Sequence, residues 1–471
     1  MIPGHVGPVL VERAEEALQS GLKGPHRLLS SPSSSDLWLA AGLRTPFARV
    51  DGPLAPLGAI EMSVPVMRAM ARLEPSPPRP GSQPGAGLAR EGIRPDLLVW
   101  GTVIPNLGFS NIAREIQIEA GLDQTIPAFS TVLACSTSMV AAFEAAGMLG
   151  HGGRELALVG GVESMSRVQV GLSQNLSDGM RRFSQARSLA QRLAALKSVS
   201  ARDVRLQKLE VKNRATGKSM GEHTEEMAKT WGIAREAQDK LALASHEKAV
   251  AGQKSGFFDD LIVPVAETSR DGFPRADTSL EKLAKLQPAF DRTSGRGTIT
   301  AGNSSPLTDG AAGLWVATGA GLKRLPDAIP RARLVDWEVA AVDIFNEGLL
   351  MAPTYAIPRM LARNGLRYAD VALWEIHEAF SAQVLCNYAA LESASFRRDK
   401  VGVDFDPGKL PVDRVNPHGG SVALGHPFGA TGARILSQAV KELAAMPKGS
   451  RAVVSICADG GLGTVALLQA E

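Results

Sequence analysis

Residues 131–149 read TVLACSTSMVAAFEAAGML. The apolar start predicts a buried strand over 131–134, the small residues 135–138 predict a turn, and the Ala-rich run predicts a helix over 139–149. This order of strand, turn and helix returns along the chain. Apolar runs predict further strands at 37–41, 97–104, 156–162, 371–376, 453–456 and 464–468, and further helices are predicted at 57–73, 382–391 and 432–443. The alternation indicates an α/β protein with largely buried sheets, and its return in the last third predicts two similar halves.

The composition excludes several classes of protein. The 471 residues include 51 Lys plus Arg and 48 Asp plus Glu, a net charge of +3. This balance lacks the basic footprint of a nucleic-acid-binding protein, so no nucleic-acid partner is expected. Hydrophobic residues make up 44% and charged residues 21%, as in ordinary globular domains, and no apolar run of about 18 residues predicts a transmembrane helix. At about 100–200 residues per domain, the length predicts about three folding units.

Cysteine content and the N-terminal sequence bear on the compartment. The three cysteines, Cys135, Cys386 and Cys457, are too few and too scattered for a disulfide scaffold, which indicates a reducing compartment. No CxxC pair occurs, so no structural metal site is expected. The N-terminal stretch lacks the apolar core of a signal peptide, and Glu12 and Glu15 are untypical of a transit peptide. We therefore expect a cytoplasmic protein.

Three segments depart from the α/β pattern. Residues 1–35 end in a Ser- and Pro-rich run and are predicted to be an appendage. Residues 75–82 contain four prolines, and they are predicted to be an exposed insertion because proline fits neither a helix interior nor a central strand. Residues 168–292 are polar, and their pattern is mostly helical.

The start of this third segment is strongly basic. Between positions 181 and 220, eleven basic residues stand against Asp203 and Glu210, a local net charge of +9. The basic residues are Arg181, Arg182, Arg187, Arg192, Lys197, Arg202, Arg205, Lys208, Lys212, Arg214 and Lys218. Such a run is most often a solvated helix face. It also suits a phosphate-bearing ligand, a membrane surface or an acidic partner, and the sequence leaves these interpretations open.

Cysteine and histidine recur at predicted strand ends and turns. Cys135 lies at the start of a helix, where the helix dipole favours a thiolate, and Cys457 follows a strand and precedes the glycine-rich turn 459–463. His377 follows a predicted strand, and His426 lies in a loop of small residues. Cysteine and histidine can form a nucleophile–base pair, and a second thiol can exchange protons near neutral pH. A buried cysteine is more often inert packing, so the spacing alone leaves both interpretations open.

Six motifs occur in a fixed order along the chain. They are Cys135-Ser136-Thr137-Ser138, Gly160-Gly161-Val162-Glu163-Ser164-Met165-Ser166, Ala301-Gly302-Asn303-Ser304-Ser305-Pro306-Leu307-Thr308-Asp309-Gly310-Ala311-Ala312, His377-Glu378-Ala379-Phe380, Gly419-Gly420 through Gly425-His426-Pro427, and Cys457 with its glycine turn. Together they resemble the thiolase family, and the resemblance covers residues 36–471. It implies two thiolase halves, each with a five-stranded mixed sheet, stacked as α-β-α-β-α, and an inserted, mainly helical loop domain. The implied boundaries are 1–35 for the appendage, 36–167 with 293–318 for the first half, 168–292 for the loop domain and 319–471 for the second half.

The resemblance also implies a reaction. Thiolases cleave a 3-ketoacyl-CoA with CoA, or run the reverse condensation. Cys135 matches the nucleophile that takes the acyl group, His426 the base that activates it, and Cys457 the second cysteine that moves protons at the enolate and at CoA. The backbone N–H groups of Cys135 and Asp459 match an oxyanion hole. His377 stands where many thiolases have Asn, which orients a water in the other oxyanion hole.

Ligands and assembly are implied in the same way. Met220 and Ser305 match positions that line the pantetheine tunnel, so acyl-CoA and CoA are the expected ligands. CoA is a substrate, and neither a metal nor a redox cofactor is implied. Thiolases form tight dimers, so at least a homodimer is expected. Cys386 and His418 receive no role and are interpreted as structural residues.

The His-Glu-Ala-Phe motif at 377–380, with residues 298–309 and 352–356, is similar to the thiolase subunit of the trifunctional fatty-acid oxidation complex and its bacterial relatives. That branch favours degradation of medium and long chains in β-oxidation. It implies a hydratase–dehydrogenase partner subunit and a peripheral membrane contact, for which the basic segment 181–220 is the candidate. Asp459 departs from the branch, which usually has Ala or Gly there. We expect its carboxylate to point away, because a negative charge would oppose the enolate.

Three alternatives stay open. A short-chain acetoacetyl-CoA thiolase shares the motifs. A 3-ketoacyl synthase shares the fold and uses a cysteine with two histidines, but it has no counterpart of Cys457, which counts against it. A non-catalytic thiolase-like protein with a lipid-binding or structural role is opposed by the intact set of Cys135, His377, His426 and Cys457.

Overall fold

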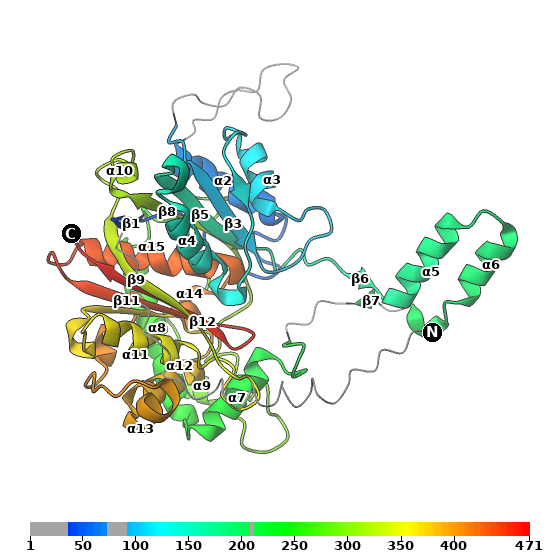
Figure 1. Cartoon of the computed structure of the whole chain (residues 1–471). Coiled ribbons are helices and arrows are strands. Elements are labelled where there is room, and N and C mark those ends of the chain that lie inside the picture. Colours follow the sequence, from blue (N-terminus) through cyan, green and yellow to red (C-terminus); the bar gives the residue numbers. More distant parts are fainter. Residues whose placement is uncertain (1–35, 73–91, 205, 208–211) are drawn as a thin grey trace, which may run out of the picture.

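Strands from both ends of the sequence build one mixed sheet. The computed structural model describes residues 36–72, 92–204, 206–207 and 212–471. The strands of the main sheet are β1 (Leu37–Ala40), β2 (Ala48–Arg49), β3 (Leu97–Thr102), β4 (Ala128–Phe129), β5 (Leu156–Glu163), β8 (Thr308–Thr318), β9 (Arg331–Ala341), β10 (Leu373–Ile376), β11 (Arg451–Ala458) and β12 (Leu462–Gln469). Their order is β10-β11-β12-β9-β1-β8-β5-β3-β4, with β2 beside β8 (Figure 1).

Helices lie between and outside the two halves of this sheet. They are α2 (Ala59–Ala71), α3 (Ile112–Ala120), α4 (Thr137–Met148), α11 (Pro353–Arg363), α12 (Ser381–Glu392) and α15 (Thr431–Ala444). The central pair, α4 and α15, packs on the inner face of both halves. The outer face of the first half is covered by α2 and α3, and that of the second half by α11 and α12 (Figure 1).

Alternate side chains of each strand face different layers. Val99 packs on the central helices and Leu98 on α2 and α3. In the second half Val454 packs on the central helices, and Val453 packs on α11 and α12. Strands that are buried on both faces must be apolar at every position, which is why they stand out in the sequence as continuous apolar runs. The expected α-β-α-β-α stack is confirmed.

The expectation of five full strands in each half needs a correction. The first half has five, but the second has four, β9 to β12, and β1 joins the halves by pairing with both β8 and β9. At the position of a fifth strand, beside β10, the described part of the structure has only an isolated parallel bridge between Trp374 and Val415. The next residue, Asn416, has a φ of 46°, so the chain turns out of the sheet there. The equivalent strand of the first half, β4, is itself only two residues long.

The strand predicted over 131–134 is also wrong. The strand of this region is β4, which ends at Phe129, and Val132 is 58% exposed. The Thr137 side chain accepts a hydrogen bond from the backbone N–H of Leu133 and donates one to the carbonyl of Ala134. These bonds hold a tight turn in which Ala134 has a φ of 44°. The apolar residues therefore form a turn before α4 instead of a strand.

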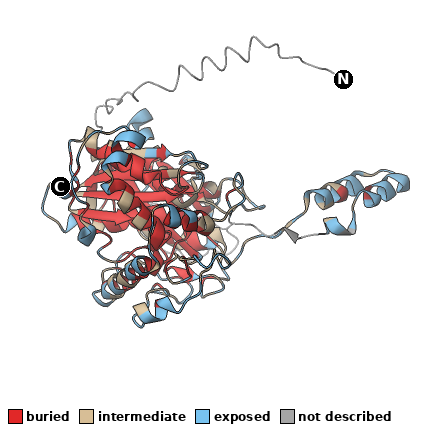
Figure 2. Ribbon diagram, turned by 90° about the horizontal axis from the view of Figure 1, so that it is seen from below, coloured by how far each residue is buried: buried red, intermediate tan, exposed pale blue. Residues whose placement is uncertain are grey.

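The segment 168–292 is mostly helical, as expected. Its elements are β6 (Gly171–Leu172), α5 (Gln174–Gln185), α6 (Leu189–Lys197), β7 (Leu206–Gln207), α7 (Met220–Thr230), α8 (Arg235–Lys254) and α9 (Leu280–Ala284). Helix α8 packs on α12 and on the short α14 (Ser421–Leu424) of the body. By contrast, α5 and α6 form a hairpin that projects from the body and is exposed almost throughout (Figures 1 and 2).

Some predictions fall outside the described residues. These are the appendage 1–35, the insertion 75–82 and the residues Arg205, Lys208 and Glu210. Among the described helices, none combines the length and apolar character that a membrane crossing requires.

The approach of α15 to α4 gives a prediction about stability. A Cβ at Gly432 would lie 2.3 Å from the backbone nitrogen of Met139. We expect Gly432→Ala to lower the free energy of unfolding by about 1–3 kcal/mol, because overpacking forces the two helices apart. Thermal and urea unfolding measure this. Gly147→Ala in α4 is the matched control, because its Cβ would meet nothing within 4 Å. It should be neutral or stabilising by about 0.5–1 kcal/mol, and equal stability of both variants would contradict the packing argument.

Candidate active site

The candidate site lies where the N-terminal ends of the two central helices meet. Cys135 is in the 3-10 turn Ala134–Ser136, directly before α4, and His426 precedes the turn Phe428–Ala430 that leads into α15. The backbone N–H of Ala433 donates a 2.8 Å hydrogen bond to Ser138 Oγ, which ties the two helix starts together. Both side chains therefore extend from the starts of the two buried central helices.

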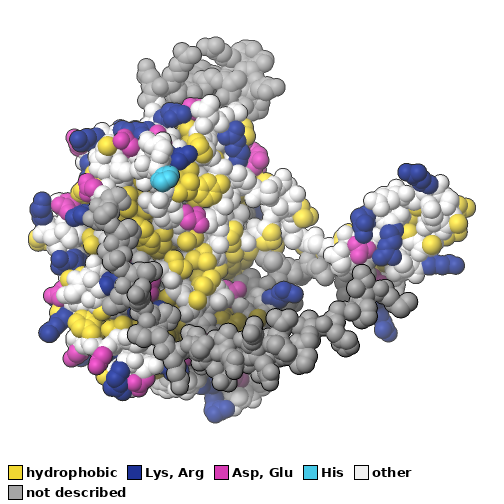
Figure 3. Space-filling view, in the orientation of Figure 1, with side chains coloured by type: hydrophobic (Ala, Val, Ile, Leu, Met, Phe, Trp, Pro, Cys, Tyr) yellow, Lys and Arg dark blue, Asp and Glu magenta, His cyan; other side chains and the backbone are white. Residues whose placement is uncertain are grey.

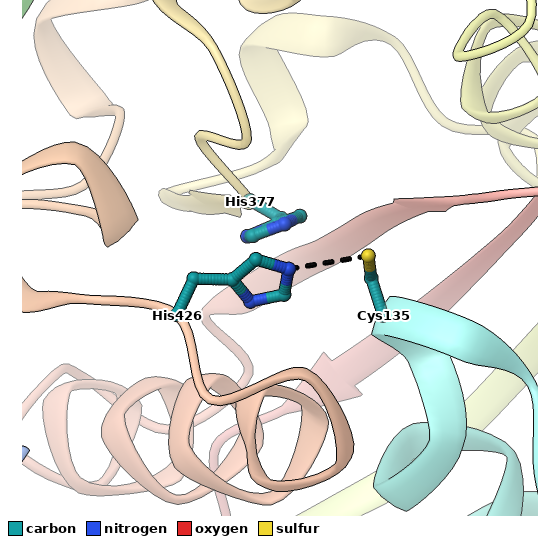
Figure 4. A group of neighbouring side chains, drawn as sticks. All are labelled: Cys135, His377 and His426. Atoms are coloured by element: carbon teal, nitrogen blue, oxygen red, sulfur yellow. Dashed lines mark hydrogen bonds between the residues drawn. The ribbon is translucent and has the colours of Figure 1, made fainter. Parts of the chain in front are cut away.

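Cys135 and His426 are in direct contact (Figure 4). The distance from His426 Nε2 to Cys135 Sγ is 3.1 Å. His426 Nδ1 lies 2.6 Å from the hydroxyl of Thr431, and this hydroxyl donates to the carbonyl of Pro427 at 2.8 Å. A hydroxyl has one proton, so Nδ1 must be the donor in its contact with Thr431. The lone pair of Nε2 therefore faces the thiol, as a base for Cys135 requires.

His377 completes a compact group with this pair. Its ring lies over that of His426, with centroids 4.3 Å apart, and the three residues offer donor atoms that all lie within 4.8 Å of one another (Figure 4). His377 Nδ1 lies 2.9 Å from Ser421 Oγ. Among the described residues nothing pairs with its Nε2, although the atom is buried. A buried polar atom without a partner is costly, and here it marks a place for an incoming group.

The loop that carries His426 is held by a buried carboxylate. Glu163, at the end of β5, accepts a hydrogen bond from the backbone N–H of Gly429 at 3.1 Å. It also accepts from the backbone of Val103 and Ile104 and from the hydroxyl of Thr102. Glu163 thus links the ends of β3 and β5 to the His426 loop. Its burial raises its pKa to about 7, while these four donors act in the opposite direction.

Burial keeps the reacting pair uncharged at rest. It raises the pKa of Cys135 to about 12, and the charge of Asp459 acts in the same direction. Hydrogen bonds from the backbone N–H groups of Cys135 and Asp459 to the thiol lower this pKa in part. Burial, together with the positive charge of Arg434, lowers the pKa of His426 to about 3. Thiol and imidazole are therefore both neutral at rest, and N–H donors near the sulfur favour a negative charge when one forms there.

Cys457 and Asp459 lie beside this group. Cys457, near the end of β11, is buried, and both its burial and the neighbouring Cys135 raise its pKa well above the usual value. The Asp459 carboxylate accepts hydrogen bonds from Asn213 Nδ2 at 2.8 Å and from the backbone N–H of Gly460 at 2.6 Å. It is thus turned toward Asn213, yet close enough for its charge to raise the pKa of Cys135.

The structure also locates the other residues singled out in the sequence. Cys386 is buried in α12, and His418 stacks on Phe257 with ring centroids 3.6 Å apart. Met220 begins α7, and the backbone N–H of Ser305 donates to the carbonyl of Ala379 at 2.9 Å.

Sequence reasoning missed the residues that orient the histidines. Thr431, Ser421 and Arg434 received no role, and neither did Asn213, which holds Asp459. Glu163 was part of a quoted motif, but its function as the anchor of the His426 loop was not inferred. The usable signal was the presence of small hydroxyl residues near each histidine in the loops. Their partners depend on side-chain directions that no spacing gives.

A pocket of about 450 Å³ opens beside α7. One wall is formed by α7 and the residues on either side of it, including Lys218, His223 and Trp231, and the other by the loop 344–349. The charge of Asp459 raises the pKa of His223, against the effect of burial. The N-terminal end of α7 therefore lies near the turn between β11 and β12. The lining is mixed: it includes apolar side chains such as Met227 and Trp231, and it also includes the Lys218–Glu226 ion pair at 2.5 Å and Glu347. The lysine is thus matched by a carboxylate within the pocket itself.

Cys135, His377 and His426 are also residue types that bind soft metal ions. Here Nδ1 of His426 is engaged by Thr431, Nδ1 of His377 by Ser421, and Nε2 of His426 by the thiol itself. The expectation of no metal stays a prediction.

The family profiles for the N-terminal and C-terminal domains of thiolase match residues 86–320 and 328–470. The chain belongs to the thiolase family. It is 35% identical over 442 residues to a 3-ketoacyl-CoA thiolase of Yersinia enterocolitica, covering 92% of this chain and 96% of the relative. A 3-ketoacyl-CoA thiolase of Yersinia pestis is 36% identical over 439 residues, covering 91% and 96%.

Solved structures agree with this assignment. The acetyl-CoA acetyltransferase of Bacillus anthracis matches with a TM-score of 0.71 at 30% identity, covering 93% of this chain and 99% of that one. Human mitochondrial 3-ketoacyl-CoA thiolase in complex with CoA matches with a TM-score of 0.73 at 25% identity, covering 93% and 98%. The thiolase fold expected from the sequence is confirmed.

The geometry predicts how this thiolase reacts with an alkylating agent. Cys135 should be the first cysteine that iodoacetamide modifies, because Cys386 and Cys457 are buried. We expect His426→Ala to slow this modification by about 10²-fold or more, since the thiol loses its base. Intact-mass spectrometry with time measures the rate. Asp459→Asn should have the opposite effect. Because the charge of Asp459 raises the pKa of Cys135, its removal should lower that pKa and speed alkylation. An unchanged rate in His426→Ala would contradict the assigned pair.

Proposed function

We propose that this thiolase cleaves a 3-ketoacyl-CoA with CoA to acetyl-CoA and an acyl-CoA shortened by two carbons, in fatty-acid β-oxidation. The observation that carries the proposal is the 3.1 Å contact between the His426 base and the Cys135 thiol. The activity is the one named in the Yersinia relatives, which match the chain over more than nine-tenths of its length.

In the first half-reaction Cys135 gives its proton to His426 and attacks the C3 carbonyl of the substrate. The C2–C3 bond then breaks, the acyl group stays on Cys135, and the enolate of acetyl-CoA forms. The enolate oxygen is stabilised by the protonated Nε2 of His426 and by His377, directly or through a water. Cys457 gives a proton to the enolate carbon, and acetyl-CoA leaves.

The second half-reaction restores the enzyme. The Cys457 thiolate takes the proton from an incoming CoA thiol, and the resulting thiolate attacks the acyl-Cys135 thioester. We expect the oxyanion that forms to be held by the backbone N–H groups of Cys135 and Asp459, both of which lower the pKa of the Cys135 thiol. The shortened acyl-CoA leaves, and Cys135 regains its proton from His426. One proton has moved from CoA to the carbon of acetyl-CoA, so the cycle balances.

We place the acyl-CoA near α7. The resemblance assigns Met220, the first residue of α7, and Ser305 to the pantetheine tunnel, and this assignment supports the placement. A homodimer stays our prediction for the smallest assembly, and the cytoplasm stays our prediction for the compartment.

A second candidate is a short-chain thiolase that acts on acetoacetyl-CoA. It is favoured by the likeness of the fold to acetyl-CoA acetyltransferases, such as that of Bacillus anthracis at 30% identity. The two candidates share every catalytic residue, so the substrate decides between them.

The test is CoA-dependent cleavage of acetoacetyl-CoA and 3-ketohexadecanoyl-CoA side by side. We expect both to be cleaved and the long chain to be preferred, and preference for acetoacetyl-CoA would select the second candidate. Cys135→Ala should lower kcat by at least about 10³-fold, because the covalent step is lost.

Two variants sharpen this assay. Cys457→Ala should still take an acyl group from an acyl-CoA donor, seen as a mass increase on Cys135, but should not complete thiolysis. Cys386→Ala is the matched cysteine control and should keep full activity. A wild-type protein that cleaves neither substrate, or an active Cys135→Ala variant, would overturn the proposal.

The α5–α6 hairpin is our candidate for the expected contact beyond the active site. Its exposed apolar side chains include Met180 (55%), Leu189 (74%), Leu193 (50%) and Leu196 (57%). Exposed basic residues lie among them, namely Arg181, Arg182, Arg187, Arg192, Lys197 and Arg202 (Figure 3). Apolar side chains flanked by Arg and Lys are typical of helices that lie at an anionic membrane surface. We propose that surface as the contact, and a hydratase–dehydrogenase subunit as the alternative.

This proposal is tested by sedimentation with vesicles. Vesicles that contain phosphatidylserine should carry the protein down more than vesicles of phosphatidylcholine, and salt should weaken the difference. The double variant Leu189→Glu with Leu193→Glu should lower the partition at least about tenfold, because two apolar side chains are lost from the interface. Leu107→Glu is the matched control, since Leu107 is 88% exposed outside the hairpin. Equal sedimentation of all three proteins would point to the partner subunit instead.

A further inference from the structure

Ser421 joins His377 to a buried arginine. Arg434, in α15, donates from Nη2 to Ser421 Oγ at 2.8 Å, and the same oxygen lies 2.9 Å from His377 Nδ1. All three side chains are buried, with exposed fractions of 3% for Arg434, 0% for Ser421 and 1% for His377. No other hydrogen-bond partner of the Ser421 hydroxyl is found among the described residues.

The available donors and acceptors determine the direction of each hydrogen bond between Arg434, Ser421 and His377. Arginine has only donors, so Ser421 Oγ must accept from Arg434. The single hydroxyl hydrogen of Ser421 then has one available acceptor, which is Nδ1 of His377. If Nδ1 carried the ring proton instead, the hydroxyl hydrogen would be buried without a partner, a costly arrangement. The favoured state therefore has a bare Nδ1 and a proton on Nε2.

Arg434 is itself held in place. Its Nη1 faces Gln438 Oε1 at 3.4 Å, and Gln438 Nε2 lies 3.3 Å from both carboxylate oxygens of Glu375 on β10. Glu442 of α15 shares the site with Glu375, and burial raises the pKa of both carboxyls. The charges of Glu375 and Glu378 oppose the lowering of the Arg434 pKa by burial. The guanidinium is thus a donor that lies between Ser421 and Gln438.

We propose that Ser421 and Arg434 are positioning residues that fix the ring proton of His377 on Nε2. The proton is thus placed on the buried Nε2 of His377, an atom that has no hydrogen-bond partner among the described residues. His377 then presents an N–H donor to the oxygen of the enolate, or to a water bound to it, without a preceding proton shift. The two histidines of the site therefore have opposite tautomers. The contact with Thr431 makes Nε2 of His426 an acceptor, and the contact with Ser421 makes Nε2 of His377 a donor.

The proton position can be read without any turnover. Long-range ¹H–¹⁵N correlation spectra of the whole protein, labelled with ¹⁵N-histidine, separate a nitrogen with a proton from one without. The His377→Asn spectrum identifies the signals of His377 by their absence. We expect the pattern of a protonated Nε2 and a bare Nδ1. A protonated Nδ1 in the wild-type protein overturns the proposal.

Kinetics provide the second arm, which rests on the proposed function. Ser421→Ala should lower kcat for thiolysis by about 10-fold or more with little change in KM for CoA, as losses of groups that orient a catalytic histidine do. Ser421→Thr keeps the hydroxyl and should stay within a few-fold of wild type. In the His377→Asn background, which has no ring proton to place, Ser421→Ala should have almost no further effect.

The outcomes separate the two hypotheses. If the wild-type protein has no thiolase activity, the proposed function fails, while the spectra still decide where the proton of His377 lies. Ser421→Ala is compared in two backgrounds, wild type and His377→Asn. If it lowers kcat by the same factor in both, Ser421 has only a structural role and the proposal is wrong. A Ser421→Thr variant as impaired as Ser421→Ala would also overturn the proposal.

Discussion

The contact between the N-terminal ends of α4 and α15 is the constraint on which this site depends. Gly432 allows the backbones to touch, and the hydrogen bond from Ala433 to Ser138 fixes their register. Because both helices lie between the two halves of the sheet, their starts cannot shift without disturbing both halves. This rigidity brings Cys135 and His426, which are 291 positions apart in sequence, to within 3.1 Å. In the proposed mechanism, the nucleophile and its base therefore meet without a closing motion.

Burial is the second constraint, and it sets the chemistry. In this dry interior, isolated charges are costly, so the thiol and the two imidazoles are kept neutral. The same low polarity makes each remaining N–H donor effective when an oxyanion forms. Neutral histidines are useful only if the proton sits on the correct nitrogen. Thr431 and Ser421 therefore matter as much as the rings that they touch, because a hydroxyl with a fixed partner determines the tautomer of its neighbour.

The inserted segment serves the site and the surface in different ways. Ser245 of α8 donates to Glu378 at 2.7 Å, directly after His377, and Asn213 holds Asp459. These bonds attach the segment to both edges of the site. Within the described residues, the side-chain hydrogen bonds of the α5–α6 hairpin stay inside the segment, and several of its apolar side chains are exposed. The part of the segment that packs on the body thus contacts the candidate site, while the projecting hairpin is the part for which we propose a membrane contact.

The sequence by itself determined the layers of the fold, because a strand buried on both faces must be apolar at every position and stands out as a run. It also predicted Cys135, His377, His426 and Cys457 as the catalytic group, since their motifs resemble those of thiolases in kind and order. It could not determine where the apolar residues before Cys135 leave the sheet, because that turn depends on the hydroxyl of Thr137. Only the tertiary structure decided which nitrogen of each histidine carries a proton. That choice depends on hydrogen bonds from Thr431, Ser421 and Arg434, whose side-chain directions are fixed by the packing of helices distant in sequence.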